Sequence, residues 1–185
     1  MKRGTFFILF GLFWIHLFSQ NNVQFKAEYI DFKLDSTQFA INGIYEFKNN
    51  SAKDVEIPIV FPFAEDVKDI DSIRLISLNN MSALPYEKIK KEIRFRLHIP
   101  AKDSLSVNIY YSSRSKKKNV YILTTTRFWE KPLEIAYYSL AIDKGINLKT
   151  LSLKPDSSSV KYGEQVYFWK KEKFLPEKDF VVEIE

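Results

Sequence analysis

Apolar and polar side chains alternate with a period of two along most of this 185-residue chain. The alternation is clearest in residues 91–99, where Phe95 and Leu97 alternate with Arg94 and Arg96. Successive side chains of a β-strand point to opposite faces, so this pattern predicts a strand with one buried face. Similar patterns predict strands at 38–48, 53–61 and 104–112, and near 23–34, 71–78, 119–126, 133–142, 147–154, 164–170 and 179–184.

Short, turn-like sequences separate some of these predicted strands. The strands at 38–48 and 53–61 are linked by Asn49-Asn50-Ser51, and a similarly short link joins 91–99 to 104–112. Residues of this type favour tight turns between neighbouring strands. We therefore expect each pair to form an antiparallel hairpin.

Regularly spaced strands with short turns predict an all-β fold, specifically an antiparallel β-sandwich of immunoglobulin-like architecture with roughly ten strands. One irregularity is expected in residues 23–34, where the alternation changes phase between Tyr29 and Ile30 and so indicates a bulge or a bend. Residues 20–185 contain no internal repeat and no evident linker. We expect them to form a single domain.

The first 19 residues differ in character from the rest of the chain. Lys2 and Arg3 precede an apolar run of about 13 residues, which is the length of the hydrophobic region of a secretory signal. A helix of that length is shorter than the roughly 30 Å hydrocarbon core of a membrane. We expect residues 1–19 to be a cleaved signal peptide, with an uncleaved anchor as the alternative. The mature protein then begins near Gln20, has no stable membrane span and is periplasmic or extracellular.

The composition narrows the possible partners. Cysteine is absent, so the chain has no disulfide and no thiol that could carry a lipid. Removal of Lys2 and Arg3 with the signal lowers the formal net charge from +5 to +3. An excess of this size is too small to indicate a nucleic-acid partner, and we expect none.

The chain offers few residues for catalysis. His98 is the one histidine outside the signal segment, and it lies on the polar face of its predicted strand. Serine–histidine catalysis needs a positioned histidine, and a zinc site needs several His, Cys or carboxylate ligands. We expect no catalytic residue, metal or cofactor, and therefore not an enzyme. The competing class is a carboxylate-based glycan hydrolase, because any two of the 23 acidic residues could flank a glycosidic bond.

Two groups of residues are candidates for contact with a partner. Phe128 and Trp129 form an aromatic pair after Thr124–Thr126, whose side chains favour extended backbone. We expect Trp129 at the rim of the sandwich, where it either closes the core or contacts a partner. The second group is a basic tip between two strands that could meet an anionic lipid or polysaccharide: Arg114, Lys116, Lys117 and Lys118.

Two stretches resemble an exported bacterial β-sandwich family of unknown function. The first is INGIYEFKN at 41–49 followed by VEIPIVFP at 55–62, which is similar to the opening of that family. The second is YILTTTRFWEKP at 121–132, which resembles a later signature in which Tyr-Ile-Leu-Thr-Thr leads through Trp to Gly-Pro. Lys131 replaces the glycine here. The resemblance implies a β-rich fold and a cell-envelope location, and it implies no activity.

Together these features predict an exported, non-enzymatic β-sandwich protein of the cell envelope that acts as a protein-binding or structural module. The expected partner is an envelope protein, with a glycan as the second choice. The alternatives are a glycan-binding module and the carboxylate-based glycan hydrolase.

The signal interpretation leads to a first prediction. Intact mass or N-terminal sequencing of the protein from its host should place the mature N-terminus within about two residues of Gln20, because the apolar run is too short to remain as an anchor. A full-length chain recovered in the membrane fraction would contradict this expectation.

Overall fold

The computed structural model describes residues 22–185, so the predicted signal segment lies outside the described residues. The described residues form 14 strands and two short 3₁₀ helices, η1 (Val67–Asp69) and η2 (Thr124–Trp129). The all-β prediction is confirmed, with more strands than the roughly ten expected. The strands are β1 (Val23–Leu34), β2 (Gln38–Asn49), β3 (Val55–Pro62), β4 (Ile70–Ser77), β5 (Ser82–Ala83), β6 (Glu87–Ile89), β7 (Glu92–Ile99), β8 (Ser104–Arg114), β9 (Lys118–Tyr121), β10 (Leu133–Ile142), β11 (Leu148–Leu151), β12 (Ser157–Lys161), β13 (Glu164–Phe174) and β14 (Phe180–Ile184).

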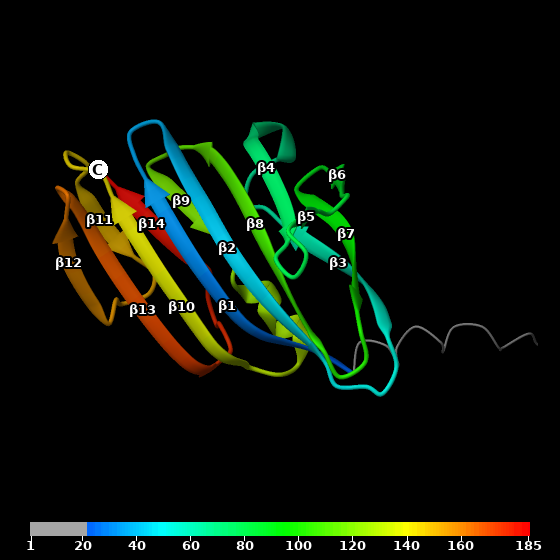
Figure 1. The fold of residues 1–185 in the computed structure, drawn as a ribbon. Coiled ribbons are helices and arrows are strands. Elements are labelled where there is room, and N and C mark those ends of the chain that lie inside the picture. Colours follow the sequence, from blue (N-terminus) through cyan, green and yellow to red (C-terminus); the bar gives the residue numbers. More distant parts are fainter. Residues whose placement is uncertain (1–21) are drawn as a thin grey trace, which may run out of the picture.

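One long sheet and two short sheets make up the fold (Figure 1). The long sheet has eight strands in the order β12-β13-β10-β1-β2-β8-β4-β5, and its pairs are antiparallel except for the parallel pair β1–β10. The short sheets have the orders β3-β7-β6 and β11-β14-β9. Both cover the same face of the long sheet: Phe32 of β1 stacks on Phe180 of β14 at 4.2 Å, and Tyr45 of β2 meets Phe61 of β3 at 5.5 Å.

The two hairpins expected from the sequence do not form. Strand β2 pairs with β1 and β8, whereas β3 pairs with β7. The connections β2–β3 and β7–β8 therefore lead from one layer of the sandwich to the other. A short link fits a hairpin or a crossing between layers equally well. The choice depends on which partner strand buries the apolar face of each strand, and this is a tertiary effect.

The buried side chain of Asn49 ties these two connections together. Its Nδ2 donates to the carbonyl oxygens of Lys53 at 2.8 Å and of Ile99 and Pro100 at 3.0 Å each. Its Oδ1 accepts hydrogen bonds from the backbone N–H and the hydroxyl of Ser51. Asn49 is 0% exposed, so the amide that holds the turn is not accessible in the folded protein.

Strand β1 contains the expected irregularity, but at a different place. The register with β2 shifts between Phe25 and Ala27, not between Tyr29 and Ile30. Beyond the shift, Glu28 lies on the inner face with Ile30, while Tyr29 points outward. The sequence-based interpretation placed the change too late because Tyr29 continues the apolar alternation of Phe25 and Ala27, although its side chain points outward in the structure.

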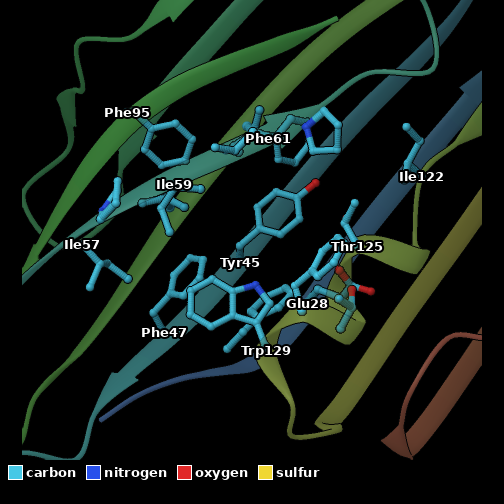
Figure 2. A pocket seen from close by; sticks show the side chains of 18 of the residues that line it. Glu28, Tyr45, Phe47, Ile57, Ile59, Phe61, Phe95, Ile122, Thr125 and Trp129 are labelled. Carbon is cyan, nitrogen blue, oxygen red and sulfur yellow. The ribbon is translucent and has the colours of Figure 1, made fainter. Parts of the chain in front are cut away.

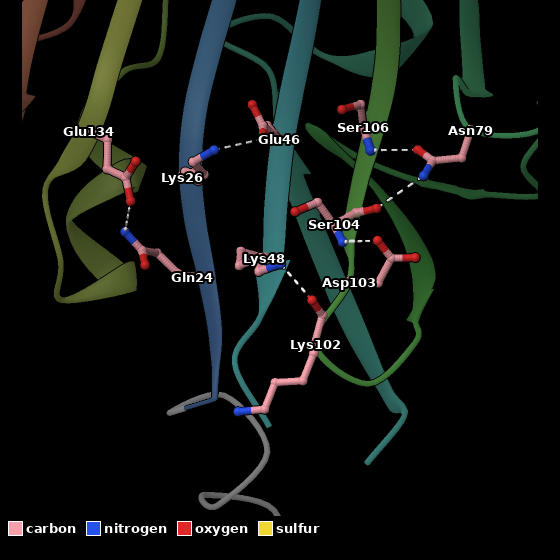
Figure 3. Close-up of polar contacts among 10 residues, drawn as sticks. All are labelled: Gln24, Lys26, Glu46, Lys48, Asn79, Lys102, Asp103, Ser104, Ser106 and Glu134. Carbon is pink, nitrogen blue, oxygen red and sulfur yellow. Dashed lines mark hydrogen bonds and ion pairs between the residues drawn. The ribbon is translucent and has the colours of Figure 1, made fainter. Parts of the chain in front are cut away.

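The opposite face of the long sheet is lined with polar pairs (Figure 3). Lys26 of β1 forms a 3.1 Å ion pair with Glu46 of the neighbouring strand β2. Where β8 begins, Asn79 accepts a hydrogen bond from the Ser106 N–H and donates to the Ser104 carbonyl, both at 3.0 Å. The Lys26–Glu46 pair lies on the hydrated outer face, whereas Asn79 satisfies backbone groups of β8 beyond the end of β4; the apolar core lies on the inner face.

The orientation of β7 gives a prediction about the core. Phe95 is 5% exposed on the inner face, and Arg94 next to it is exposed. Phe95→Ala should lower the free energy of unfolding by about 3–5 kcal/mol, as for a buried aromatic ring. Arg94→Ala should change it by no more than about 0.5 kcal/mol, as at surface positions. Urea denaturation measures both, and equal effects would contradict this orientation.

Candidate binding pocket between the sheets

A pocket of about 640 Å³ opens between β3 and η2, over the inner face of β1, β2 and β8 (Figure 2). The long sheet forms its floor, β3 and β7 form one wall, and η2 forms the other. Side chains that line it include Phe25, Glu28, Tyr45, Phe47, Ile57, Ile59, Phe61, Phe95, Val107, Ile109, Tyr121, Thr125, Thr126 and Trp129. The volume is in the range of sites that enclose small organic ligands.

The pocket exists because the second layer is interrupted. Among residues 22–185, strand β3 pairs only with β7 and β9 pairs only with β14, so each has a free edge there. Pro58 and Pro62 lie four positions apart on β3, so their backbone nitrogens point to the same side of the strand. A proline nitrogen carries no hydrogen, so it fits a paired strand only where it points away from the partner. Both prolines therefore remove donors from the free edge of β3, which disfavours its pairing with a further strand.

Helix η2 owes its position to Asp179, which lies just before β14. One carboxylate oxygen of Asp179 accepts hydrogen bonds from the Leu123 N–H at 3.1 Å, the Thr124 N–H at 3.0 Å and the Thr124 hydroxyl at 2.8 Å. The expectation of extended backbone at residues 124–126 is therefore wrong. The hydrogen bonds to a residue distant in sequence outweigh the β-propensity of threonine.

The rings of η2 and of the sheet form one aromatic wall. Trp129 is half-buried, and its ring centroid lies 5.9 Å from that of Phe25 and 5.3 Å from that of Phe47. Phe25 and Phe47 stack at 5.1 Å. Phe128, by contrast, is 84% exposed at the rim. Trp129 thus covers one end of the core and also presents a surface to the pocket.

Two tyrosines meet at the floor of the pocket. The hydroxyl groups of Tyr45 and Tyr121 lie 2.8 Å apart, and burial raises the pKa of both side chains well above its usual range, so both remain neutral. The ring of Tyr45 lies over Gly43. A Cβ atom at Gly43 would come within 2.3 Å of the Tyr45 hydroxyl oxygen. Glycine at this position therefore leaves the space that lets Tyr45 reach Tyr121.

Glu28 is the one acidic residue within 22–185 that is fully buried, with 2% exposure. Its Oε1 accepts a hydrogen bond from the hydroxyl of Tyr138 on the neighbouring strand β10. Within the described residues, its other carboxylate oxygen has no hydrogen-bond partner and neither oxygen has a cationic one. Burial raises the pKa of Glu28 to about 7, and the hydrogen bond from Tyr138 opposes part of this shift.

The structure brings only some of the sequence-predicted residues to the pocket. Phe128 and Trp129 line it, whereas the basic tip does not. Arg114, Lys116, Lys117 and Lys118 lie around the turn from β8 to β9, where Lys116 forms a 2.5 Å ion pair with Glu65. Glu28 was missed by sequence reasoning. The available signal was its spacing of two residues from Ile30, because residues two apart share one face of a strand and Ile30 lies on the inner face of β1.

Metal sites and membrane spans were assessed over residues 22–185 alone. In that range, no three His, Asp or Glu residues are grouped so that they could hold a metal ion. The same range has no helix with the length and apolar character needed to cross a membrane.

Comparison with known proteins gives a family match over part of the chain. Residues 101–182 match the model of a domain of unknown function (DUF4424), which covers less than half of the chain. The match extends from the turn before β8 into β14 and includes η2. It leaves out Glu28 and Tyr45. No curated protein matches the chain in sequence.

Solved structures share the fold at low sequence identity. A proposed nutrient-binding protein from Legionella pneumophila aligns with a TM-score of 0.76 and 14% identity, over 89% of this chain and 67% of that chain. An M1 zinc metallopeptidase from Deinococcus radiodurans aligns with a TM-score of 0.54 and 6% identity, over 88% of this chain and 42% of the peptidase. At these identities the similarity establishes the fold alone.

The buried carboxyl group predicts a specific dependence of stability on pH. The pKa of Glu28 in the folded protein, about 7, lies above its ordinary value of 4.5, so the folded state holds this proton more tightly than the unfolded state. The contribution of Glu28 to stability is therefore most favourable below pH 4.5 and falls as the pH rises to about 7, by about 3 kcal/mol in total.

Glu28→Gln removes this titration. The unfolding free energy of the variant relative to the native protein should therefore rise over that pH interval and level off above it. Urea denaturation across the interval measures the difference. Thr125→Ser, a change at an uncharged residue of the same pocket, removes no titrating group; it is the control and should give a flat difference. A flat difference for Glu28→Gln as well would show that Glu28 does not titrate as described.

Proposed function

We propose that this chain is an exported, non-enzymatic binding module that holds a small, largely apolar molecule in the pocket between its sheets. The observation that carries the proposal is the pocket itself, an aromatic and aliphatic cavity of about 640 Å³ with a few polar groups gathered at its floor. Pockets of this size and lining are typical of sites for small organic ligands.

The lining favours an apolar molecule over a glycan. Most of the lining consists of aromatic and aliphatic side chains. Glu28 and the Tyr45–Tyr121 pair lie at the floor, and the other polar residues of the lining are Glu92, Thr125, Thr126, Glu130 and Lys131. The many hydroxyl groups of a sugar would lose their hydrogen bonds to water against such walls, and each unpaired group would weaken binding. The same argument disfavours the glycan hydrolase, although Glu28, Glu92 and Glu130 all line the pocket.

A protein partner was the first expectation from the sequence, and the pocket shifts the preference to a small molecule. Phe128 and the basic tip remain the candidate surface for an envelope protein. Two further observations support the proposal. The basic and apolar pattern of residues 1–19 supports export. The Legionella pneumophila protein with this fold is described as a proposed nutrient-binding protein, which supports a binding role.

Tryptophan fluorescence offers a direct test, because the expected mature chain contains only two tryptophans. Trp129 lines the pocket, whereas Trp169 is 1% exposed and does not. In a Trp169→Phe variant the emission comes from Trp129 alone, and a Trp129→Phe variant isolates Trp169. Titration with phenylbutanol, a neutral apolar probe, should shift or quench the emission of the first variant in a saturable way.

The emission of the second variant should stay unchanged, since Trp169 lies in the closed core. A saturable change in neither variant, or an equal change in both, would contradict a ligand site in this pocket. Each variant carries a single Trp→Phe substitution, so each serves as the control for the other.

A further inference from the structure

The charges that line the pocket are predominantly negative. Glu28 lies at the floor, Glu92 and Glu130 lie on β7 and at the end of η2, and Lys131 is the single basic residue of the lining. Glu92 is paired with Arg94 at 2.5 Å, and Glu130 and Lys131 are exposed at the rim, where solvent screens their charges. Glu28 is the charge that a ligand inside the pocket would meet without such screening.

The hydrogen-bonding groups at the floor are mainly acceptors. Tyr138 donates to one oxygen of Glu28, which leaves the second oxygen without a partner among residues 22–185. The hydroxyl groups of Tyr45 and Tyr121 share one hydrogen bond, so the pair retains a single free donor. A ligand that fills the pocket pairs best with these acceptors if its polar end carries hydrogen-bond donors.

The aromatic wall also favours a ligand with a positively charged group. Phe25, Phe47 and Trp129 lie within 5.1 to 5.9 Å of one another, measured between ring centroids, and all three line the pocket. The faces of aromatic rings attract cations, and the attraction is stronger where water is excluded. Walls of this type combined with a carboxylate suit an ammonium group that is attached to an apolar body.

We propose that the ligand is an apolar primary amine, whose protonated amino group pairs with the free oxygen of Glu28 and whose hydrocarbon part packs against Phe25, Phe47 and Trp129. This proposal rests on the pocket function proposed above and adds the chemical class of the ligand. The amine supplies the cation that Glu28 lacks among residues 22–185. An anionic ligand such as a fatty acid would meet the unpaired carboxylate instead and be repelled.

Three matched probes separate these possibilities: phenylbutylamine, phenylbutanol and phenylbutyrate, which share an apolar part and differ in the charge of the polar end. Isothermal titration at about pH 8, where Glu28 is largely ionised, measures each affinity. We expect the amine to bind at least about tenfold more tightly than the alcohol, as for a charge-assisted hydrogen bond, and the carboxylate to bind most weakly.

The substitution Glu28→Gln keeps the size of the side chain and its ability to accept the Tyr138 hydrogen bond while removing the charge. It should abolish the advantage of the amine over the alcohol. Glu177→Gln changes an exposed carboxyl group that does not line the pocket and should leave that advantage in place.

Equal affinities for amine and alcohol in the native protein would overturn the amine proposal and leave the pocket function standing. So would an unchanged amine preference in Glu28→Gln. Failure of all three probes to bind would overturn both proposals. Tight binding of phenylbutyrate would assign the opposite role to Glu28, that of a protonated donor to an acid.

Discussion

The side-chain amide of Asn49 joins the two connections by which the chain passes between the long sheet and the short sheet β3-β7-β6. Its nitrogen donates to carbonyl groups from both connections, and its oxygen holds Ser51. A shift of either connection would leave buried polar groups unpaired, at about 1–3 kcal/mol for each. Asn49 therefore fixes where β3 begins above the long sheet, and the position of β3 sets the width of the gap that becomes the pocket.

The gap lowers the stability of the fold. A core built for stability alone would fill about 640 Å³ with side chains and would place an apolar residue where Glu28 lies. The structure instead keeps a buried carboxyl group with one hydroxyl partner and no cation among the described residues. Strained or unpaired groups of this kind concentrate at functional sites, because their destabilising effect persists only where the surrounding structure supports it. The pocket and Glu28 are thus better explained together than separately.

The residues of the site differ in how far the sequence could reveal them. Trp129 was identified from its place in an aromatic pair after a predicted strand, and the structure places it at the pocket. Glu28 was not identified, although it has the same parity as Ile30 on β1. Alternation alone cannot distinguish a charged residue that faces solvent from one that faces a cavity, because each is simply a polar position next to apolar ones. Tyr45 and Tyr121 were assigned to strands, and their hydrogen bond joins strands of different sheets.

Local periodicity determined the class of the fold and the buried face of most strands, because the pleat of a strand sends successive side chains to opposite sides whatever its neighbours are. It could not determine which strands pair. Strands β2 and β3 are joined by a short turn and yet lie in different layers, because each finds its partner among residues far away in the sequence. Tertiary structure alone decided that η2 is helical, through Asp179, and that the second layer is open above Glu28. Both depend on contacts between segments that are far apart in the sequence, and local sequence patterns do not reveal which of these segments meet.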